Sequence, residues 1–241
     1  MSAWPFYLAY LMPASAVAGY LLGGVFAFST LFLAFVIIPL LDLIVGPDRT
    51  NPAPEEMEAL AHRLSFRVVT NLYAVVQVTL VIWGAYVVTH ATLSAIELTG
   101  LILSIAITTG GIGITVAHEL CHKKDFIEKT LGKVLLITVS YMHFYIEHNT
   151  GHHVNVCTPK DPATARLGES FYAFYPRTVI GSFRSAWNIE IERLQKAGYA
   201  KWSRRNQMLW FVALPILFAG ILGVSWGWQA LPYFFAQSVI A

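Results

Sequence analysis

Residues 96–122 read IELTGLILSIAITTGGIGITVAHELCH, an apolar run that ends in two histidines one helical turn apart. The part from 96 to 117 carries one charged side chain, Glu97 near its start. It is long enough to cross a bilayer, which takes roughly 20 apolar residues. His118 and His122 follow directly, where such a helix would leave the membrane. The stretch therefore predicts a membrane-spanning helix that places two imidazoles at one membrane face.

The composition of the whole chain is typical of an integral membrane protein. Of its 241 residues 56% are hydrophobic and 12% charged, and the mean hydropathy is +0.57. An average soluble domain carries about 25% charged residues. We predict an all-α membrane protein with a single domain over residues 1–241, built as a six-span helical bundle whose sixth span is incomplete. The predicted spans are 4–22, 25–45, 68–89, 96–117, 207–225 and the partial 229–241.

The cations predict the orientation of the bundle. All 16 Lys and Arg residues lie in two loops: Arg49, Arg63 and Arg67 between the second and third spans, and the rest in 118–206. Cytoplasmic loops carry such an excess, so both loops are predicted to be cytoplasmic. Cations spread beside apolar spans give no footprint of nucleic-acid binding. The apolar segment 131–146 would divide the basic loop if it crossed, so we predict a re-entrant or interfacial helix there.

A second histidine-rich stretch lies in the same loop, at residues 147–153 (EHNTGHH). His148 and His152 have the i,i+4 spacing of one helix face, and His153 adds a nitrogen on an adjacent face. Imidazole is the commonest protein ligand for mid-row transition metals. We therefore predict a metal-binding region over 118–206, next to membrane lipid. Its predicted ligands are His118, His122, His148, His152 and His153.

The first box also satisfies the His-Glu-x-x-His pattern of zinc metalloproteases, in which Glu119 would be the general base. A catalytic zinc takes three protein ligands, fewer than the five histidines of the two boxes. Five histidines suit two metal ions, or one metal ion with further histidines around its ligands. An intramembrane zinc protease remains an alternative interpretation of this motif.

The sequences of both boxes resemble those of the membrane-bound alkane monooxygenases, which belong to the histidine-box hydroxylase and desaturase superfamily. HELCHKK at 118–124 is similar to their first box, and HFYIEHNTGHHV at 143–154 to their second. TPKDPATARLGE at 158–169 and PLLD at 39–42 also match. The resemblance covers essentially the whole chain, and the Lys123-Lys124 and Glu147-His148 context favours the alkane branch.

This resemblance implies an alkane 1-monooxygenase, a non-haem di-iron enzyme of the bacterial inner membrane with its boxes on the cytoplasmic side. Such an enzyme uses O2 to hydroxylate the terminal carbon of medium- or long-chain n-alkanes, with electrons from rubredoxin and rubredoxin reductase. Two irons bound by the five histidines are the expected cofactors. Glu119, Glu147 and Asp161 become candidates to accept the second ring N–H of a ligand. Ala34, five residues before Pro39, becomes a candidate for the substrate channel, where a small side chain leaves room for longer alkanes.

The sequence also departs from that family. Its members carry two further histidine elements downstream, which this sequence does not contain. We therefore expect that this polypeptide on its own does not hold a normal di-iron centre and is inactive. An aryl-methyl hydroxylase or a fatty acid desaturase of the same superfamily stays open as an alternative function.

Overall fold

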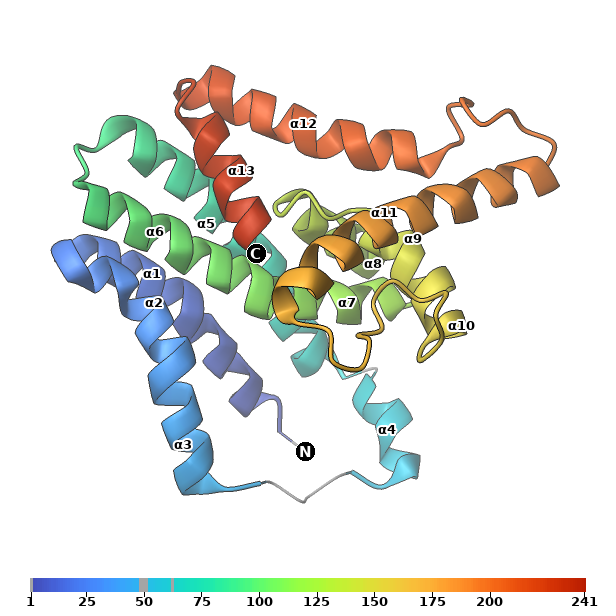
Figure 1. Ribbon diagram of the computed structural model, residues 1–241. Coiled ribbons are helices and arrows are strands. Elements are labelled where there is room, and N and C mark those ends of the chain that lie inside the picture. Colours follow the sequence, from blue (N-terminus) through green and yellow to red (C-terminus); the bar gives the residue numbers. More distant parts are fainter. Residues whose placement is uncertain (1, 48–51, 62) are drawn as a thin grey trace. The chain divides into compact units, whose positions relative to one another are not determined.

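The structure is a computed structural model that describes residues 2–47, 52–61 and 63–241, which form helices joined by turns and irregular segments, without any strand (Figure 1). Arg49, one of the cations used to predict orientation, lies outside the described residues. The chain packs as two compact units. Unit 1 comprises the residues up to Val139 together with Ala219–Ala241, and unit 2 comprises Ser140–Phe218.

Five helical segments are long and apolar enough to cross a membrane, which confirms the predicted helical membrane bundle. They coincide closely with the first five predicted spans. The sixth predicted span corresponds to α13, a shorter apolar helix at Ala230–Ile240. The five segments are Trp4–Leu22, Gly24–Val45, Leu64–His90, Ala95–His122 and Gln207–Trp226.

Several of these segments change helix type along their length. The fourth combines α6 (Ala95–Ile107), the π-helix η4 (Thr108–Gly113) and α7 (Ile114–His122). The first combines the 3-10 helix η1 (Trp4–Tyr10) with α1 (Leu11–Leu22). The second combines η2 (Gly24–Phe28), α2 (Ser29–Phe32), the π-helix η3 (Leu33–Ile37) and α3 (Ile38–Val45). The π-helix η4 directly precedes α7, which carries the first histidine box. Such π-turns are frequent at functional sites.

In unit 1, α8 (Phe126–Ile137) turns back and packs along α7 and α5 (Leu64–His90) (Figure 1). Asp125 caps its start by accepting the backbone N–H groups of Ile127 and Glu128, at 2.9 and 3.1 Å. The buried Glu128 carboxylate accepts a 2.8 Å bond from Arg67 of α5. At Gly132 an added Cβ would lie only 3.1 Å from the Ala117 carbonyl, so the two helices approach closely. The chain thus folds back on α7 after the first box, and a re-entrant or interfacial position of residues 131–146 stays a prediction.

The prediction of one helix over 131–146 is wrong, because α8 ends at Ile137 and α9 begins at Phe144. Thr138 is held by side chains from distant helices. Gln77 donates to its hydroxyl at 2.8 Å, and Gln237 of α13 donates to its carbonyl at 2.6 Å. Ser140 then adopts the left-handed conformation, with φ of 52°. The helix is interrupted because tertiary hydrogen bonds replace the next helical turn.

Unit 2 is built around α11 (Phe171–Lys196), which packs on the short helical run α9 (Phe144–Ile146), η5 (Glu147–His152) and α10 (His153–Asn155). The buried Glu190 of α11 accepts a 2.7 Å bond from the backbone N–H of Gln207, the first residue of α12 (Gln207–Trp226). Arg193 donates two 2.7 Å bonds to the same carboxylate. One carboxylate therefore joins the end of α11 to the start of α12.

The short helix α4 (Pro54–Ala61) belongs to unit 1.

Candidate metal centre

His118 and His122 form a pair on successive turns of α7, as the i,i+4 spacing predicts. Their Nε2 atoms lie 3.3 Å apart, and their rings meet edge to face with centroids 4.7 Å apart. His122 is exposed and His118 is partly exposed. The pair comes at the end of the fourth apolar segment, where Lys123 leaves the helix in an extended conformation.

His148 and His153 form the second pair, in unit 2, and their spacing is i,i+5. Their Nε2 atoms lie 3.1 Å apart, with ring centroids 4.5 Å apart. The predicted α-helical geometry of His148 and His152 is wrong, because residues 147–152 form the π-helix η5, although the two rings still stack with centroids 5.4 Å apart. A π-turn bonds i to i+5, so it brings the fifth residue along under the first. Phe144 stacks on the His148 ring at 4.6 Å and fixes its plane.

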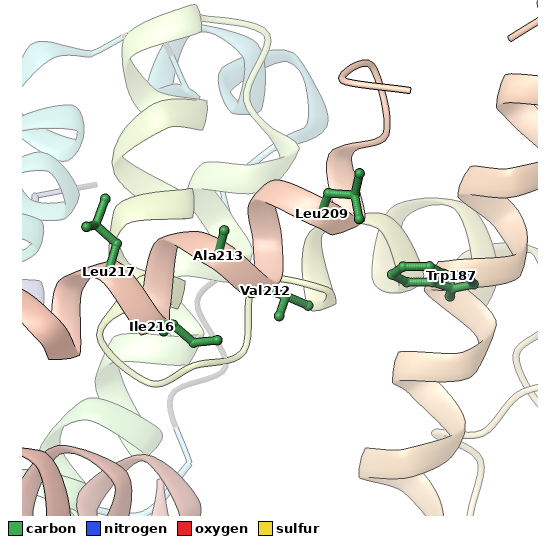
Figure 2. Close-up of a pocket in the computed structure, with 6 residues that line it drawn as sticks. All are labelled: Trp187, Leu209, Val212, Ala213, Ile216 and Leu217. Atoms are coloured by element: carbon green, nitrogen blue, oxygen red, sulfur yellow. The ribbon is translucent and has the colours of Figure 1, made fainter. Parts of the chain in front are cut away.

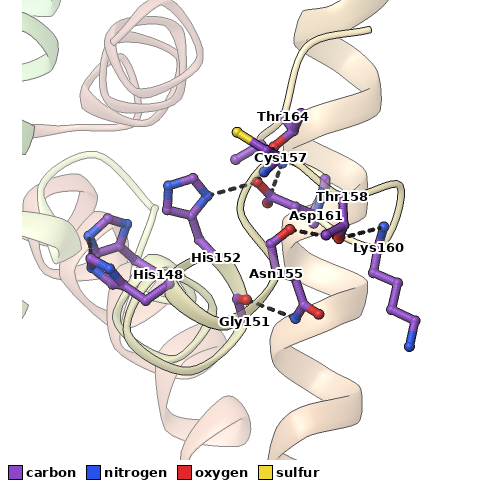
Figure 3. A network of polar contacts seen from close by, with 12 residues as sticks. His148, Gly151, His152, Asn155, Cys157, Thr158, Lys160, Asp161 and Thr164 are labelled. Carbon is purple, nitrogen blue, oxygen red and sulfur yellow. Dashed lines mark hydrogen bonds and ion pairs between the residues drawn. The ribbon is translucent and has the colours of Figure 1, made fainter.

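His152 turns instead toward Asp161, in the loop that follows α10 (Figure 3). Its Nδ1 lies 2.9 Å from Asp161 Oδ2. The Asp161 carboxylate also accepts the Ala163 backbone N–H at 2.9 Å and the Thr164 hydroxyl at 2.5 Å. Burial acts to raise the pKa of Asp161, but these hydrogen bonds outweigh it and the pKa is lowered. An ionised carboxylate only accepts, so the His152 proton sits on Nδ1 and the Nε2 lone pair is available to a metal.

The other two acidic candidates behave differently from Asp161. The exposed Glu119 carboxylate pairs with Lys123 at 2.5 Å, on its own helix face. Glu147 is buried, and its Oε1 has no hydrogen-bond partner among the described residues. Burial raises the pKa of Glu147, against a bond from Ser185 of α11 that lowers it. Among the described residues, Asp161 is the one of the three that bonds a box histidine.

His143 lies at the start of the second box but is part of neither pair. It is buried, with its ring against Tyr141 and Phe183 at centroid distances of 4.6 and 5.3 Å. Its Nε2 has no hydrogen-bond partner among the described residues. Burial lowers the pKa of His143 to about 4, so the ring is neutral. His143 is not among the predicted ligands, and the structure does not place it in either pair.

Ala34, the candidate for the substrate channel, lies in the π-helix η3 and is partly exposed. Its neighbours Phe32 and Phe35 are exposed apolar side chains. The local structure gives the residue a surface position in the second apolar segment. Its role in substrate size remains a prediction.

The donor set fits a transition metal. The candidate ligands in the described residues are His118, His122, His148 and His153. Metal–nitrogen bonds of about 2.1 Å put neighbouring ligand nitrogens about 3.0–3.4 Å apart. Both pairs have this separation, 3.3 Å in unit 1 and 3.1 Å in unit 2. Each pair is therefore spaced to take two adjacent positions on one ion.

The sequence profile of the fatty acid desaturase family matches residues 94–241, a segment that includes both histidine boxes. The chain belongs to this family. Within the fatty acid desaturase family it is similar to alkane 1-monooxygenases, which confirms the resemblance found in the sequence. Alkane 1-monooxygenase 2 of Pseudomonas aeruginosa is 38% identical over 214 residues, covering 87% of this chain and 56% of that protein. Alkane 1-monooxygenase 2 of Alcanivorax borkumensis is 33% identical over 234 residues, covering 96% and 61%.

The chain spans little more than half the length of these relatives. A family member with another name is also similar over a shorter part. The hydroxylase component of the xylene/toluene monooxygenase of Pseudomonas putida is 29% identical over 132 residues, covering 55% of this chain and 36% of that protein. The comparisons favour the alkane branch over the aryl-methyl and desaturase alternatives and over the zinc protease.

Proposed function

We propose that the protein hydroxylates the terminal carbon of medium- or long-chain alkanes, as an alkane 1-monooxygenase of the bacterial inner membrane. The observation that carries the proposal is the pair of imidazole Nε2 atoms in each box, spaced as neighbouring metal ligands. The printed names of the relatives supply the substrate class.

In this proposal iron is held by the two histidine pairs together with His152. Bound iron would supply the activation of O2, since a terminal C–H bond offers no group for acid–base attack. Phe144 holds the His148 ring in plane and excludes water from one of its faces. Asp161 keeps the proton of His152 on Nδ1, which would leave the Nε2 lone pair free to bind a metal. The resemblance implies two irons at this site.

The electron supply and the topology belong to the same proposal. Rubredoxin, reduced by its reductase, is the proposed donor. The cations of residues 118–206 give the proposed cytoplasmic face a positive charge suited to an acidic protein. The same cations support a cytoplasmic location of both boxes by the positive-inside rule.

The test is product analysis with the complete gene product in bacterial membranes, supplied with rubredoxin, its reductase, NADH and dodecane under ¹⁸O2. We expect 1-dodecanol that carries one ¹⁸O atom, and a loss of at least about 100-fold in His118→Ala. His90→Ala is the matched control, because His90 is an exposed histidine bonded to its own helix. Unlabelled alcohol, or an unsaturated fatty acid in place of any alkanol, would contradict the proposal.

A further inference from the structure

An apolar groove runs along one side of unit 2, between α11 and α12. Its first part has a volume of about 510 Å³, and Figure 2 shows its lining. A second part of about 640 Å³ shares Trp187 and Val212 with the first, so the two are continuous. The first part is lined by Trp187 together with Leu209, Val212, Ala213, Ile216 and Leu217 of α12.

The two ends of the groove differ in chemistry. The α12 end is wholly apolar and lies on a helix suited to span a membrane. From Leu209 to Leu217 the helix rises about 12 Å, enough for a large part of an acyl chain. The α11 end adds Arg184 and Asn188, both exposed. Among the described residues Arg184 has no hydrogen bond or ion pair, and no Asp or Glu lines either part.

The polar end continues into a rim of aromatic and cationic side chains. The Trp187 and Trp202 rings have centroids 5.9 Å apart. Lys201 lies over the Trp202 ring, with Nζ 5.7 Å from its centroid. Glu190, the buried acid of the same helix, is already bonded to Arg193 and Gln207. Trp and Lys/Arg side chains together are typical of the headgroup level of a membrane.

We propose that this groove binds one anionic phospholipid, with an acyl chain along α12 and the phosphate at Arg184 and Lys201. The order of the groups along the groove matches such a lipid, since the apolar wall starts near the first residue of a spanning helix. An alkane would leave the cationic end without a partner. A zwitterionic headgroup also carries an ammonium group. No Asp or Glu of the described residues lines the groove to pair with it. None of the four paired histidines lines the groove.

The test is native mass spectrometry of the complete gene product, titrated with phosphatidylglycerol or with phosphatidylcholine of the same acyl chains. We expect one high-affinity phosphatidylglycerol and a preference for it of at least about tenfold. Surface cations contribute about fivefold each to binding anionic lipid. Arg184→Gln and Lys201→Gln should therefore each lower the affinity for phosphatidylglycerol by about fivefold. Lys196 is an exposed cation at the end of α11, and Lys196→Gln should leave the affinity unchanged. Equal affinity for the two lipids, or no effect of both substitutions combined, would overturn the proposal.

A second variant tests the apolar end. Ala213 is exposed on α12, so Ala213→Trp fills the groove without disturbing the core. We expect this variant to bind both lipids more weakly. In the wild type, added dodecane should leave bound phosphatidylglycerol in place. Unchanged lipid binding in Ala213→Trp would overturn the placement of the acyl chain. Displacement by dodecane would assign the groove to alkane and overturn the proposal as a whole.

Discussion

Nδ1 of His152 lies 2.9 Å from Oδ2 of Asp161, a carboxylate that is 2% exposed and bonded by the Thr164 hydroxyl and the Ala163 N–H. The His152 ring also stacks on the His148 ring, with centroids 5.4 Å apart, whereas His148 and His153 approach each other through their Nε2 atoms. The second box therefore presents a facing pair and one ring whose tautomer is fixed by an acid outside the box.

Asp161→Asn should weaken metal binding by about 10–100-fold, the usual effect of losing the carboxylate partner of a ligand histidine. The amide keeps the shape of the side chain but not its charge. The measurement is the affinity for Fe(II) or Co(II), followed by absorption. Glu192→Gln, an exposed acid on α11, is the control and should leave the affinity unchanged. An Asp161→Asn protein with wild-type affinity would show that the contact does not orient a ligand.

Arg177 should affect the His152 ring indirectly, because it holds the loop that carries Asp161. Its guanidinium donates 3.0 Å bonds to the carbonyls of Pro162 and Thr164, and 2.6 and 2.7 Å bonds to Glu169. Arg177→Lys loses this planar fork. We expect faster hydrogen exchange over residues 161–169 and a smaller loss of metal affinity than in Asp161→Asn. Lys160→Gln changes an exposed cation of the same loop and should do neither.

The loop should also loosen in acid. The hydrogen bonds from Arg177 lower the pKa of Glu169 to about 2, below its unfolded value of about 4.3. A lowered folded pKa means that the ion pair stabilises the loop above about pH 4.3, and that this contribution is lost as the pH falls toward 2. The protection of the loop amides, which is the intrinsic exchange rate at each pH divided by the measured rate, should therefore fall more between pH 5 and pH 3 in the wild type than in Glu169→Gln. An equal fall in protection in both proteins would speak against this pair.

The spans could be predicted from the sequence because hydropathy depends on composition over about 20 residues. The re-entrant or interfacial position of residues 131–146, which rests on the cations that a crossing would divide, stays a prediction. The break at Thr138 could not be predicted, because its partners Gln77 and Gln237 lie on helices far away in the sequence. The pairing of His148 with His153 was missed because a reading by helical period assumes an α-turn, and the sequence carries no simple signal for a π-turn.

Gly113→Ala should destabilise unit 1. An added Cβ there would lie 1.9 Å from Oε1 of Gln77, a fully buried side chain that is bonded to Thr138. Overpacking of this kind costs about 1–3 kcal/mol. Gly111→Ala lies in the same π-helix, with no atom within 4 Å of its added Cβ, and should cost nothing. Thermal unfolding of both variants in detergent is the measurement, and equal stabilities would contradict the packing described for η4.

Glu190→Gln should weaken the junction of α11 and α12. The carboxylate is 1% exposed, and it accepts bonds from Arg193 and from the first N–H of α12. Hydrogen bonds to a charged group contribute about 1.5–3 kcal/mol, so a loss of about that size in the free energy of unfolding is expected. Glu192→Gln, at an exposed position on the same helix, should stay within about 0.5 kcal/mol of the wild type.

If the paired histidines hold iron, the iron content per chain depends on them. The complete gene product and its variants His122→Gln, His153→Gln and His90→Gln would be purified alike and analysed for iron by elemental analysis. We expect bound iron in the wild type and in His90→Gln, and a loss of most of it in His122→Gln and His153→Gln. Iron retained at the wild-type level in both box variants, with the proteins folded, would contradict it.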